Sequence, residues 1–154
     1  MSADRTGIRV PPPVLFALPL LIGGVLERRW PWTLFPEPAI GLGLGLLLVV
    51  FGAVVAGAAV LQFRKGKTTV LPFGGTSTIV GTGVYRWTRN PMYLGMASGQ
   101  AGIALMANSV WCLAALPASV RLVYQFAIRL EEQYLSRKFG AAYEAYRTSV
   151  RRWI

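Results

Sequence analysis

Apolar residues along this chain are gathered in long runs rather than repeated at a short period. Residues 39–63 hold no charged side chain over 25 positions, and three further apolar runs cover residues 12–26, 92–107 and 109–128. A helix needs about 20 predominantly apolar residues to cross the hydrocarbon core of a bilayer. The pattern therefore predicts an all-α integral membrane bundle with about four transmembrane helices, of which the first is short.

A single polar residue, Asn108, separates the third apolar run from the fourth. A connection this short permits only a tight turn, so we expect the two segments to form an antiparallel helical hairpin. The chain is then one membrane domain. It comprises two transmembrane helices in residues 1–63, a polar loop in 64–92, the hairpin in 93–128 and a tail in 129–154.

Basic residues set the expected orientation of this domain. The loop over residues 64–92 and the tail over residues 129–154 hold most of the 16 Lys and Arg residues. Because cytoplasmic loops of membrane proteins are rich in Lys and Arg, both segments are expected in the cytoplasm. An even number of crossings places the N-terminus there as well, although Arg28 and Arg29 fall in the opposite loop. The Ala-, Gly- and Arg-rich composition favours a bacterial inner membrane.

The tail has the pattern of amphipathic helices rather than of a membrane span. Apolar side chains recur at helical spacing over residues 130–138, and Gly140 is a helix stop signal. Tyr143 and Tyr146 share one face of a second helical segment. We expect this basic, amphipathic tail to lie along the cytoplasmic face of the membrane.

Composition narrows the function classes. The chain is 54% hydrophobic with a net charge of +10 and a mean hydropathy of +0.48. Membrane topology accounts for the positive charge, because the basic residues lie almost wholly outside the apolar runs, and nucleic acid is not an expected partner. With no histidine and one cysteine, Cys112, no intramolecular disulfide and no Cys/His metal cluster is expected.

Glycines mark where the predicted helices touch. Gly41 and Gly45 are four residues apart, as are Gly95 and Gly99. This spacing lets helices approach closely in lipid. Simple packing explains the first pair, whereas Gly95, Gly99 and Gly102 also leave a face without side chains that a ligand could use.

Two polar clusters lie where predicted membrane helices begin or end. One covers residues 81–93, and the other is formed by Arg129, Glu131 and Glu132. Because the hairpin is antiparallel, its two ends should bring the clusters together. Arginines and helix N-terminal amides suit a carboxylate, acidic side chains suit ribose hydroxyls, and tyrosine rings suit stacking and a positive centre. S-adenosylmethionine carries all of these groups.

Each residue of these clusters also has a plainer interpretation. Asn90 and Pro91 are an ordinary turn signal, Arg86 and Arg89 match the cytoplasmic excess of basic residues, and the two glutamates could form a solvated helix face. Their joint presence at the two ends of one hairpin favours a ligand site.

Two stretches carry a family resemblance. GVYRWTRNPMYLG at 83–95 and EEQYLSRKFGAAYEAYRTSVRRW at 131–153 resemble the isoprenylcysteine carboxyl methyltransferase-like proteins, which belong with the membrane-embedded phospholipid methyltransferases. The usual pattern is Gly-x-Tyr-Arg, then Arg-His-Pro-x-Tyr-x-Gly, and later Glu-Glu before Phe-Gly-x-x-Tyr-x-x-Tyr. The resemblance covers residues 64–152, including KTTVLP at 67–72, and identifies the superfamily but not the methyl acceptor.

The resemblance implies an S-adenosylmethionine cofactor enclosed at the cytoplasmic side, with S-adenosylhomocysteine as product. Glu131 and Glu132 would close the cofactor pocket from the side opposite the first motif. Asn90 stands where the family often has histidine, so this side chain cannot serve as a titrating base. The other wall of the implied cofactor pocket consists of Tyr85, Arg89, Asn90, Pro91, Tyr93 and Gly95.

The acceptor decides what chemistry the protein must supply. A carboxylate is already a nucleophile at neutral pH, whereas an amine or thiol must first lose a proton, and here only the two glutamates and the tyrosines are candidate bases. We therefore expect a carboxylate on a lipophilic or prenylated molecule that enters from the bilayer. The candidate catalytic residues are Arg129, Glu132 and Arg121. Arg121 lies within the fourth apolar run, where an arginine is costly unless it faces a polar cavity.

Other functions stay open on this pattern. A phospholipid or amine N-methyltransferase and a thiol S-methyltransferase fit the same motifs. A non-catalytic membrane scaffold or small transport subunit would explain the hydropathy and the glycines, and a lipid-binding module would explain the basic tail. A soluble type of methyltransferase is excluded, because the chain lacks the alternating strand and helix pattern of a parallel sheet.

Overall fold

The computed structural model describes residues 6–65 and 78–154, and within these ranges the chain is helical without a β-sheet. The only strand-like feature described is an isolated bridge between Thr33 and Ser109. The all-α prediction is confirmed. Part of the predicted polar loop, including KTTVLP, lies outside the described residues. The elements are α1 (Pro12–Arg29), α2 (Pro38–Lys65), η1 (Gly83–Arg86), α3 (Pro91–Met106), α4 (Val110–Ala114), α5 (Leu116–Val123), η2 (Tyr124–Ile128), α6 (Arg129–Phe139) and α7 (Ala141–Ser149).

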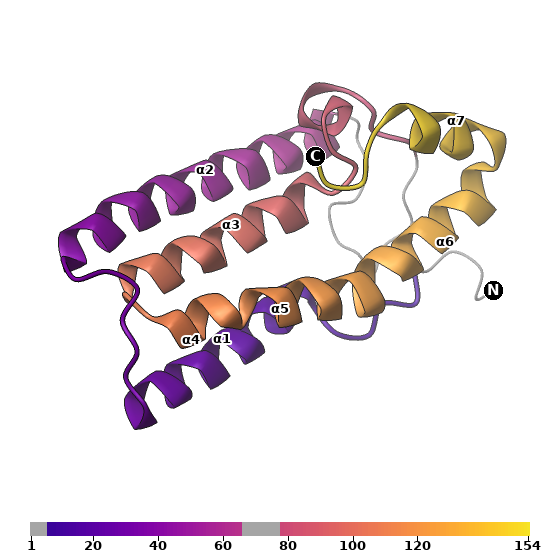
Figure 1. Ribbon diagram of the computed structural model, residues 1–154. Coiled ribbons are helices and arrows are strands. Elements are labelled where there is room, and N and C mark those ends of the chain that lie inside the picture. The colour runs from indigo at the N-terminus through magenta and orange to yellow at the C-terminus, as the bar shows by residue number, and fades with distance from the viewer. Residues whose placement is uncertain (1–5, 66–77) are drawn as a thin grey trace.

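The segments α4, α5, η2 and α6 follow one another as a nearly continuous helical rod (Figure 1). The π-helical turn η2 widens the rod at Tyr124–Ile128 without ending it. The helix predicted over residues 109–128 thus passes without a break into the helix predicted for the tail, because the chain becomes polar at Arg129 but keeps residues that favour helix, such as Arg, Leu and Glu. The rod ends where Gly140 was expected to stop it, at a positive φ of 51°.

Glycines on α2 and α3 let the two backbones touch, and this pair makes the most extensive helix contact in the described structure. A Cβ on Gly102 would lie 2.5 Å from the carbonyl oxygen of Gly45, and one on Gly95 would lie 2.6 Å from that of Gly52. The packing role expected for Gly45 is confirmed. A Cβ on Gly99 would meet nothing within 4 Å.

The predicted hairpin is confirmed at Asn108, which adopts a positive φ of 50° between α3 and α4. Its side-chain oxygen accepts hydrogen bonds from the backbone N–H groups of Leu34 and Phe35 at 3.1 and 2.9 Å, and its side-chain nitrogen donates to the Phe35 carbonyl at 2.9 Å. Ser109 donates to Glu27 at 2.6 Å. This turn therefore holds the end of the bundle farthest from the polar clusters.

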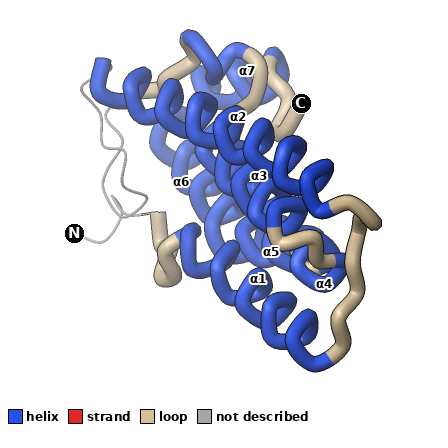
Figure 2. Tube along the Cα trace, turned by 90° about the vertical axis from the view of Figure 1, so that its left-hand side faces the viewer, coloured by secondary structure: helices blue, strands red, loops and turns tan. Residues whose placement is uncertain are grey.

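The buried core lies between α1, α3 and α5. Helix α1 packs beside α4 and α5 (Figure 2). Tyr93 on α3 meets Val123, Ala127 and Ile128 there, together with Leu15 and Phe16 on α1. The core thus aligns the start of α3 with the end of the rod's apolar part.

Two helices are long and apolar enough to cross a membrane, over Pro38–Arg64 and Val110–Phe139. The other two predicted spans do not meet that standard: α1 ends in three charged residues, Glu27, Arg28 and Arg29, and α3 has only 16 residues, about 24 Å of helix. Large apolar side chains are exposed along α2, among them Leu47 at 68% and Val54 at 64%. Such a continuous apolar surface is typical of a helix that faces lipid.

Candidate cofactor site

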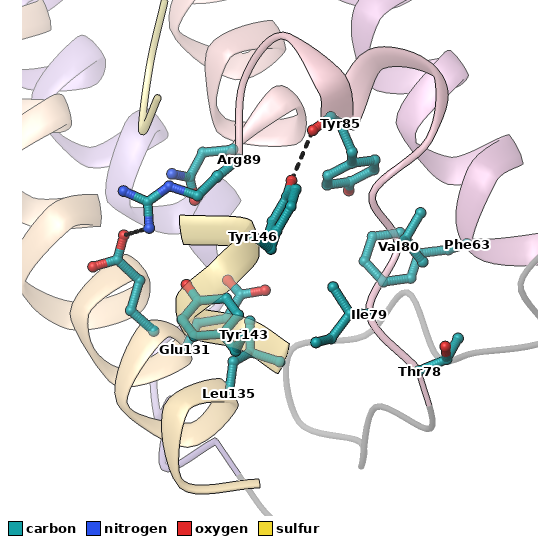
Figure 3. Close-up of a pocket in the computed structure, with 12 residues that line it drawn as sticks. Phe63, Thr78, Ile79, Val80, Tyr85, Arg89, Glu131, Leu135, Tyr143 and Tyr146 are labelled. Atoms are coloured by element: carbon teal, nitrogen blue, oxygen red, sulfur yellow. Dashed lines mark hydrogen bonds and ion pairs between the residues drawn. The ribbon is translucent and has the colours of Figure 1, made fainter. Parts of the chain in front are cut away.

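A pocket opens where α3 begins and α6 continues the rod, with α7 folded across it (Figure 3). It encloses about 540 Å³ of empty volume, part of it open to solvent. Its lining combines aromatic rings, two acids and an arginine, the mixture typical of sites for polar small molecules. The lining residues are Phe63, Thr78, Ile79, Val80, Tyr85, Arg89, Asn90, Glu131, Glu132, Leu135, Tyr143 and Tyr146.

The two polar clusters meet at this pocket, as the hairpin predicted. The guanidinium of Arg89 lies 3.2 Å from a carboxylate oxygen of Glu132, with side chains only 9% and 17% exposed. The hydroxyl of Tyr93 donates to Glu131 at 3.1 Å. Two contacts therefore join the start of α3 to α6, across more than 35 residues of sequence.

The adjacent glutamates have different partners because consecutive helical residues point about 100° apart. Glu131 faces Tyr93 on α3, whereas Glu132 faces Arg89 and Arg152. The two carboxylates therefore face different atoms, and no ion pair between Arg129 and Glu132 is described.

Arg152 was not among the candidate residues, yet it is a central partner in this site. It donates from Nε and Nη2 to the two carboxylate oxygens of Glu132, both at 2.9 Å. Its guanidinium also lies 5.2 Å from the centroid of the Tyr124 ring, within the range of a cation–π contact. The hydrogen bonds to Glu132 raise the pKa of Arg152 above its ordinary value.

Backbone carbonyls of the tail hold the first motif in place. The N–H of Arg89 donates to the carbonyl of Arg151 at 3.0 Å. The carbonyl of Arg152 accepts from the Thr88 hydroxyl at 3.1 Å and from the Asn90 side-chain nitrogen at 3.0 Å. Asn90 is only 7% exposed, so its amide acts as a buried hydrogen-bond donor, a role that needs no titrating group.

Three tyrosines supply the aromatic part of the pocket. Tyr146 donates to the carbonyl of Tyr85 at 2.8 Å, and Tyr85 packs edge-on against Phe63 with ring centroids 5.4 Å apart. Burial raises the pKa of Tyr85 well above its ordinary value and that of Tyr146 to about 12. Burial also raises the pKa of Tyr143 more than the nearby Arg89 lowers it. All three phenols therefore stay protonated at neutral pH and cannot act as bases there.

Two donor atoms of Arg89, Nε and Nη1, are buried without a described hydrogen-bond partner, although Nη1 lies in the ion pair with Glu132. The Nε atom of Arg89 is buried, and it has no hydrogen-bond partner within residues 6–65 and 78–154. A buried, unpaired N–H of a charged group is costly in a folded protein.

The structure keeps several candidate residues away from the pocket lining. Pro91 begins α3, and Gly95 lies in the contact with α2. Arg129 is exposed and lines a neighbouring polar groove that also includes Glu132. Arg121 is exposed on α5, about 200° around the helix from the buried Val123. The structure therefore groups the first motif with the glutamates but not with Arg121.

Several pocket residues were missed by the sequence reasoning. Tyr143 and Tyr146 had a signal, since both share one face of the last helix, but the tail as a whole was expected along the cytoplasmic face of the membrane. For Phe63 at the end of α2, the sequence carried no signal other than its place in the apolar run. The return of the tail that brings Arg152 to Glu132 depends on tertiary packing that no local pattern encodes.

Comparisons with known proteins place this arrangement among methyltransferases. A family model described as phospholipid methyltransferase matches residues 40–142. The protein-S-isoprenylcysteine O-methyltransferase of Saccharomyces cerevisiae is 30% identical over 109 residues, which cover 70% of this chain and 46% of the yeast protein. The human protein of the same name is 31% identical over 108 residues, covering 69% of this chain and 38% of its own length. The chain thus spans less than half the length of these two relatives. No solved structure matches it significantly.

Proposed function

Because the chain belongs to the phospholipid methyltransferase family, we propose that it is an S-adenosylmethionine-dependent methyltransferase that acts on a lipophilic acceptor at the cytoplasmic face of a membrane. The observation that carries this proposal is the ion pair between Arg89 and Glu132. It joins two distant motifs at one pocket, which membrane topology alone does not require. The exposed apolar surface of α2 supports the membrane location.

The chemistry of the pocket fits this cofactor. The unpaired Nε of Arg89 suits the carboxylate of the methionine part. Glu131 is in a position to accept from ribose hydroxyls, and the rings of Tyr85 and Tyr146 offer surfaces for adenine and for a positive centre. When bound, the cofactor supplies an already activated methyl group, so the protein's task is to align the two reactants and to exclude water.

The proposed acceptor is a carboxylate. Protonated tyrosines cannot deprotonate an amine or thiol at neutral pH, and both glutamates are engaged, Glu131 by Tyr93 and Glu132 by two arginines. A carboxylate needs no base, which agrees with the O-methyltransferase names of the relatives. Arg129, in the groove next to Glu132, is the residue proposed to steer the acceptor's negative charge.

Phospholipid or amine N-methylation and thiol S-methylation are the alternatives within the same chemistry. They would require Glu131 or Glu132 to leave its partner and take a proton. The proposed substrate is therefore a carboxylate on a prenylated or otherwise lipophilic molecule that reaches the site from the bilayer.

Calorimetry of S-adenosylhomocysteine binding to the detergent-purified chain tests the cofactor site. We expect saturable binding by wild type and at least a tenfold loss in Arg89→Gln and Glu131→Gln. Arg28→Gln removes the same charge as the first variant at the opposite end of the bundle and should bind as wild type does. Absence of binding by a folded wild type would overturn the proposal in favour of a non-catalytic membrane scaffold.

A further inference from the structure

A second hollow lies on the other side of the first motif from the cofactor pocket. We call it the apolar groove, and it comprises about 1180 Å³ of empty volume, part of it open solvent, between α2, the start of α3 and the tail. It shares no lining residue with the cofactor pocket. The residues that line the apolar groove are Phe51, Val55, Val84, Arg86, Trp87, Thr88, Leu94, Ser149, Val150, Arg151, Trp153 and Ile154.

The walls of the groove have the character of a membrane-facing surface. Phe51 is 50% exposed on α2, the helix whose apolar side faces lipid. Trp87 and Ile154 are each 81% exposed at the groove. Exposed tryptophan is enriched at the level of lipid headgroups, where an aromatic ring meets both hydrocarbon and water. Val55 lies ten residues before the end of α2, about 15 Å along the helix axis, so the groove extends to hydrocarbon depth.

The side-chain charge of the groove has one sign. Arg86 and Arg151 are its only lining residues with charged side chains, and no ion pair or side-chain hydrogen bond of either is described. Their backbones are nonetheless well anchored, Arg86 in η1 and Arg151 through its carbonyl's bond to Arg89. Anchored arginines beside an apolar channel favour a ligand with one hydrocarbon end and one anionic end.

We propose that the apolar groove binds an anionic phospholipid of the surrounding bilayer, with an acyl chain against Phe51, Val55 and Leu94 and the phosphate at Arg86 and Arg151. The residues of the first motif are divided between the apolar groove and the cofactor pocket. This division favours a bilayer lipid, rather than the methyl acceptor, as the ligand of the apolar groove. Val84, Arg86, Trp87 and Thr88 line the groove, whereas Tyr85, Arg89 and Asn90 line the cofactor pocket. A headgroup at Arg86 is thus on the far side of the chain from the cofactor.

The test is lipid retention by the full chain, which does not depend on methyl transfer. Native mass spectrometry of the detergent-purified protein, with equal amounts of phosphatidylglycerol and phosphatidylcholine added, measures which lipid stays bound. Wild type is expected to retain one phosphatidylglycerol in preference. Each arginine near an anionic membrane surface contributes about fivefold to binding. The Arg86→Gln/Arg151→Gln variant should therefore bind phosphatidylglycerol about 25-fold more weakly than wild type.

Two further variants keep the result interpretable. Arg28→Gln/Arg29→Gln removes the same charge at the other end of the bundle and should keep the preference. Val55→Trp fills the groove without changing charge and should lower retention. An equal loss in both double variants would overturn the proposal in favour of general electrostatic attraction, and so would a wild type that retains neither lipid. Glycerol phosphate, added in place of the lipids, tests the role of the hydrocarbon. If the protein retained it as strongly as phosphatidylglycerol, the acyl chains would contribute nothing and the proposal would be overturned.

Discussion

The guanidinium of Arg152 faces the carboxylate of Glu132 with two parallel hydrogen bonds, each 2.9 Å long. The same carboxylate lies 3.2 Å from Arg89, so Glu132 is shared between the first motif and the tail. A glutamate between two arginines is fixed in its orientation, and each arginine in turn is held beside the pocket.

Substitution of Arg152 should weaken cofactor binding without unfolding the chain. Arg152→Ala leaves Glu132 with one partner, and we expect roughly five- to tenfold weaker S-adenosylhomocysteine binding by calorimetry. Arg152→Lys should recover only part of the loss, because an ammonium cannot donate the paired bonds. Arg151→Ala removes a neighbouring arginine whose side chain makes no described bond to the site. An equal loss in that variant would contradict the role of the Arg152 side chain.

Removal of the Tyr93 hydroxyl should destabilise the fold. Tyr93→Phe deprives the part-buried Glu131 carboxylate of its donor, and loss of a hydrogen bond to a charged group costs about 1–3 kcal/mol. Chemical unfolding in detergent should show this loss in the free energy of unfolding. Tyr124→Phe is the matched control, since its ring stays under Arg152 and no hydrogen bond of its hydroxyl is described. If Tyr93→Phe had the same free energy of unfolding as wild type, water would have replaced the hydrogen bond of the tyrosine hydroxyl and the prediction would be contradicted.

Alanine substitutions of two glycines in α3 should distinguish the effect of helix packing on stability from the effect of helix propensity. Gly102→Ala places a Cβ 2.5 Å from the Gly45 carbonyl, and overpacking of this kind costs about 1–3 kcal/mol. Gly99→Ala meets open space and should be neutral or stabilising by up to about 1 kcal/mol, since alanine favours helix. Thermal unfolding of the two variants in one detergent measures the difference. Equal effects would mean that the contact between α2 and α3 tolerates a methyl group.

Alkaline pH should unfold the protein through its buried tyrosines. Tyr146 ionises at about 12 in the folded chain and at about 10 when unfolded, so the unfolded state holds fewer protons between these values. The contribution of Tyr146 to the free energy of unfolding should be constant below about pH 10 and should fall as the pH rises to about 12. Phenolate absorbance at 295 nm, recorded with unfolding, checks this. Titration of every tyrosine near pH 10 with the fold intact would contradict it.

The parts of the site that were predictable share one origin in the sequence. Asn108 between two apolar runs forced a hairpin, and the hairpin brought residues 81–93 to Glu131 and Glu132. The two adjacent glutamates have different partners because an α-helix turns about 100° per residue. Such inferences succeed because a tight turn and the regular rotation of a helix fix where residues lie without further tertiary information.

The missed parts depend on packing between distant segments. The rod's passage through Ile128 follows from helix propensity, which the polarity change concealed. The tail's return to Thr88 and Asn90 is set by hydrogen bonds to backbone carbonyls, which every residue possesses and no composition reveals. The exposure of Arg121 likewise depends on which face α5 turns toward the core, and an unbroken apolar run does not show that face.

The carbonyls of the tail have a consequence for scanning mutagenesis. Alanine at position 151 or 152 leaves intact the carbonyl oxygen atoms that accept from Arg89, Thr88 and Asn90. A scan of side chains would therefore pass over these bonds while they continue to shape the site. Their contribution becomes visible when an α-hydroxy acid replaces Trp153, because the Arg152 carbonyl then belongs to an ester, a poorer acceptor than an amide. Part of the hydrogen bonding that shapes this site is thus made by the main chain, and substitution of side chains does not remove it.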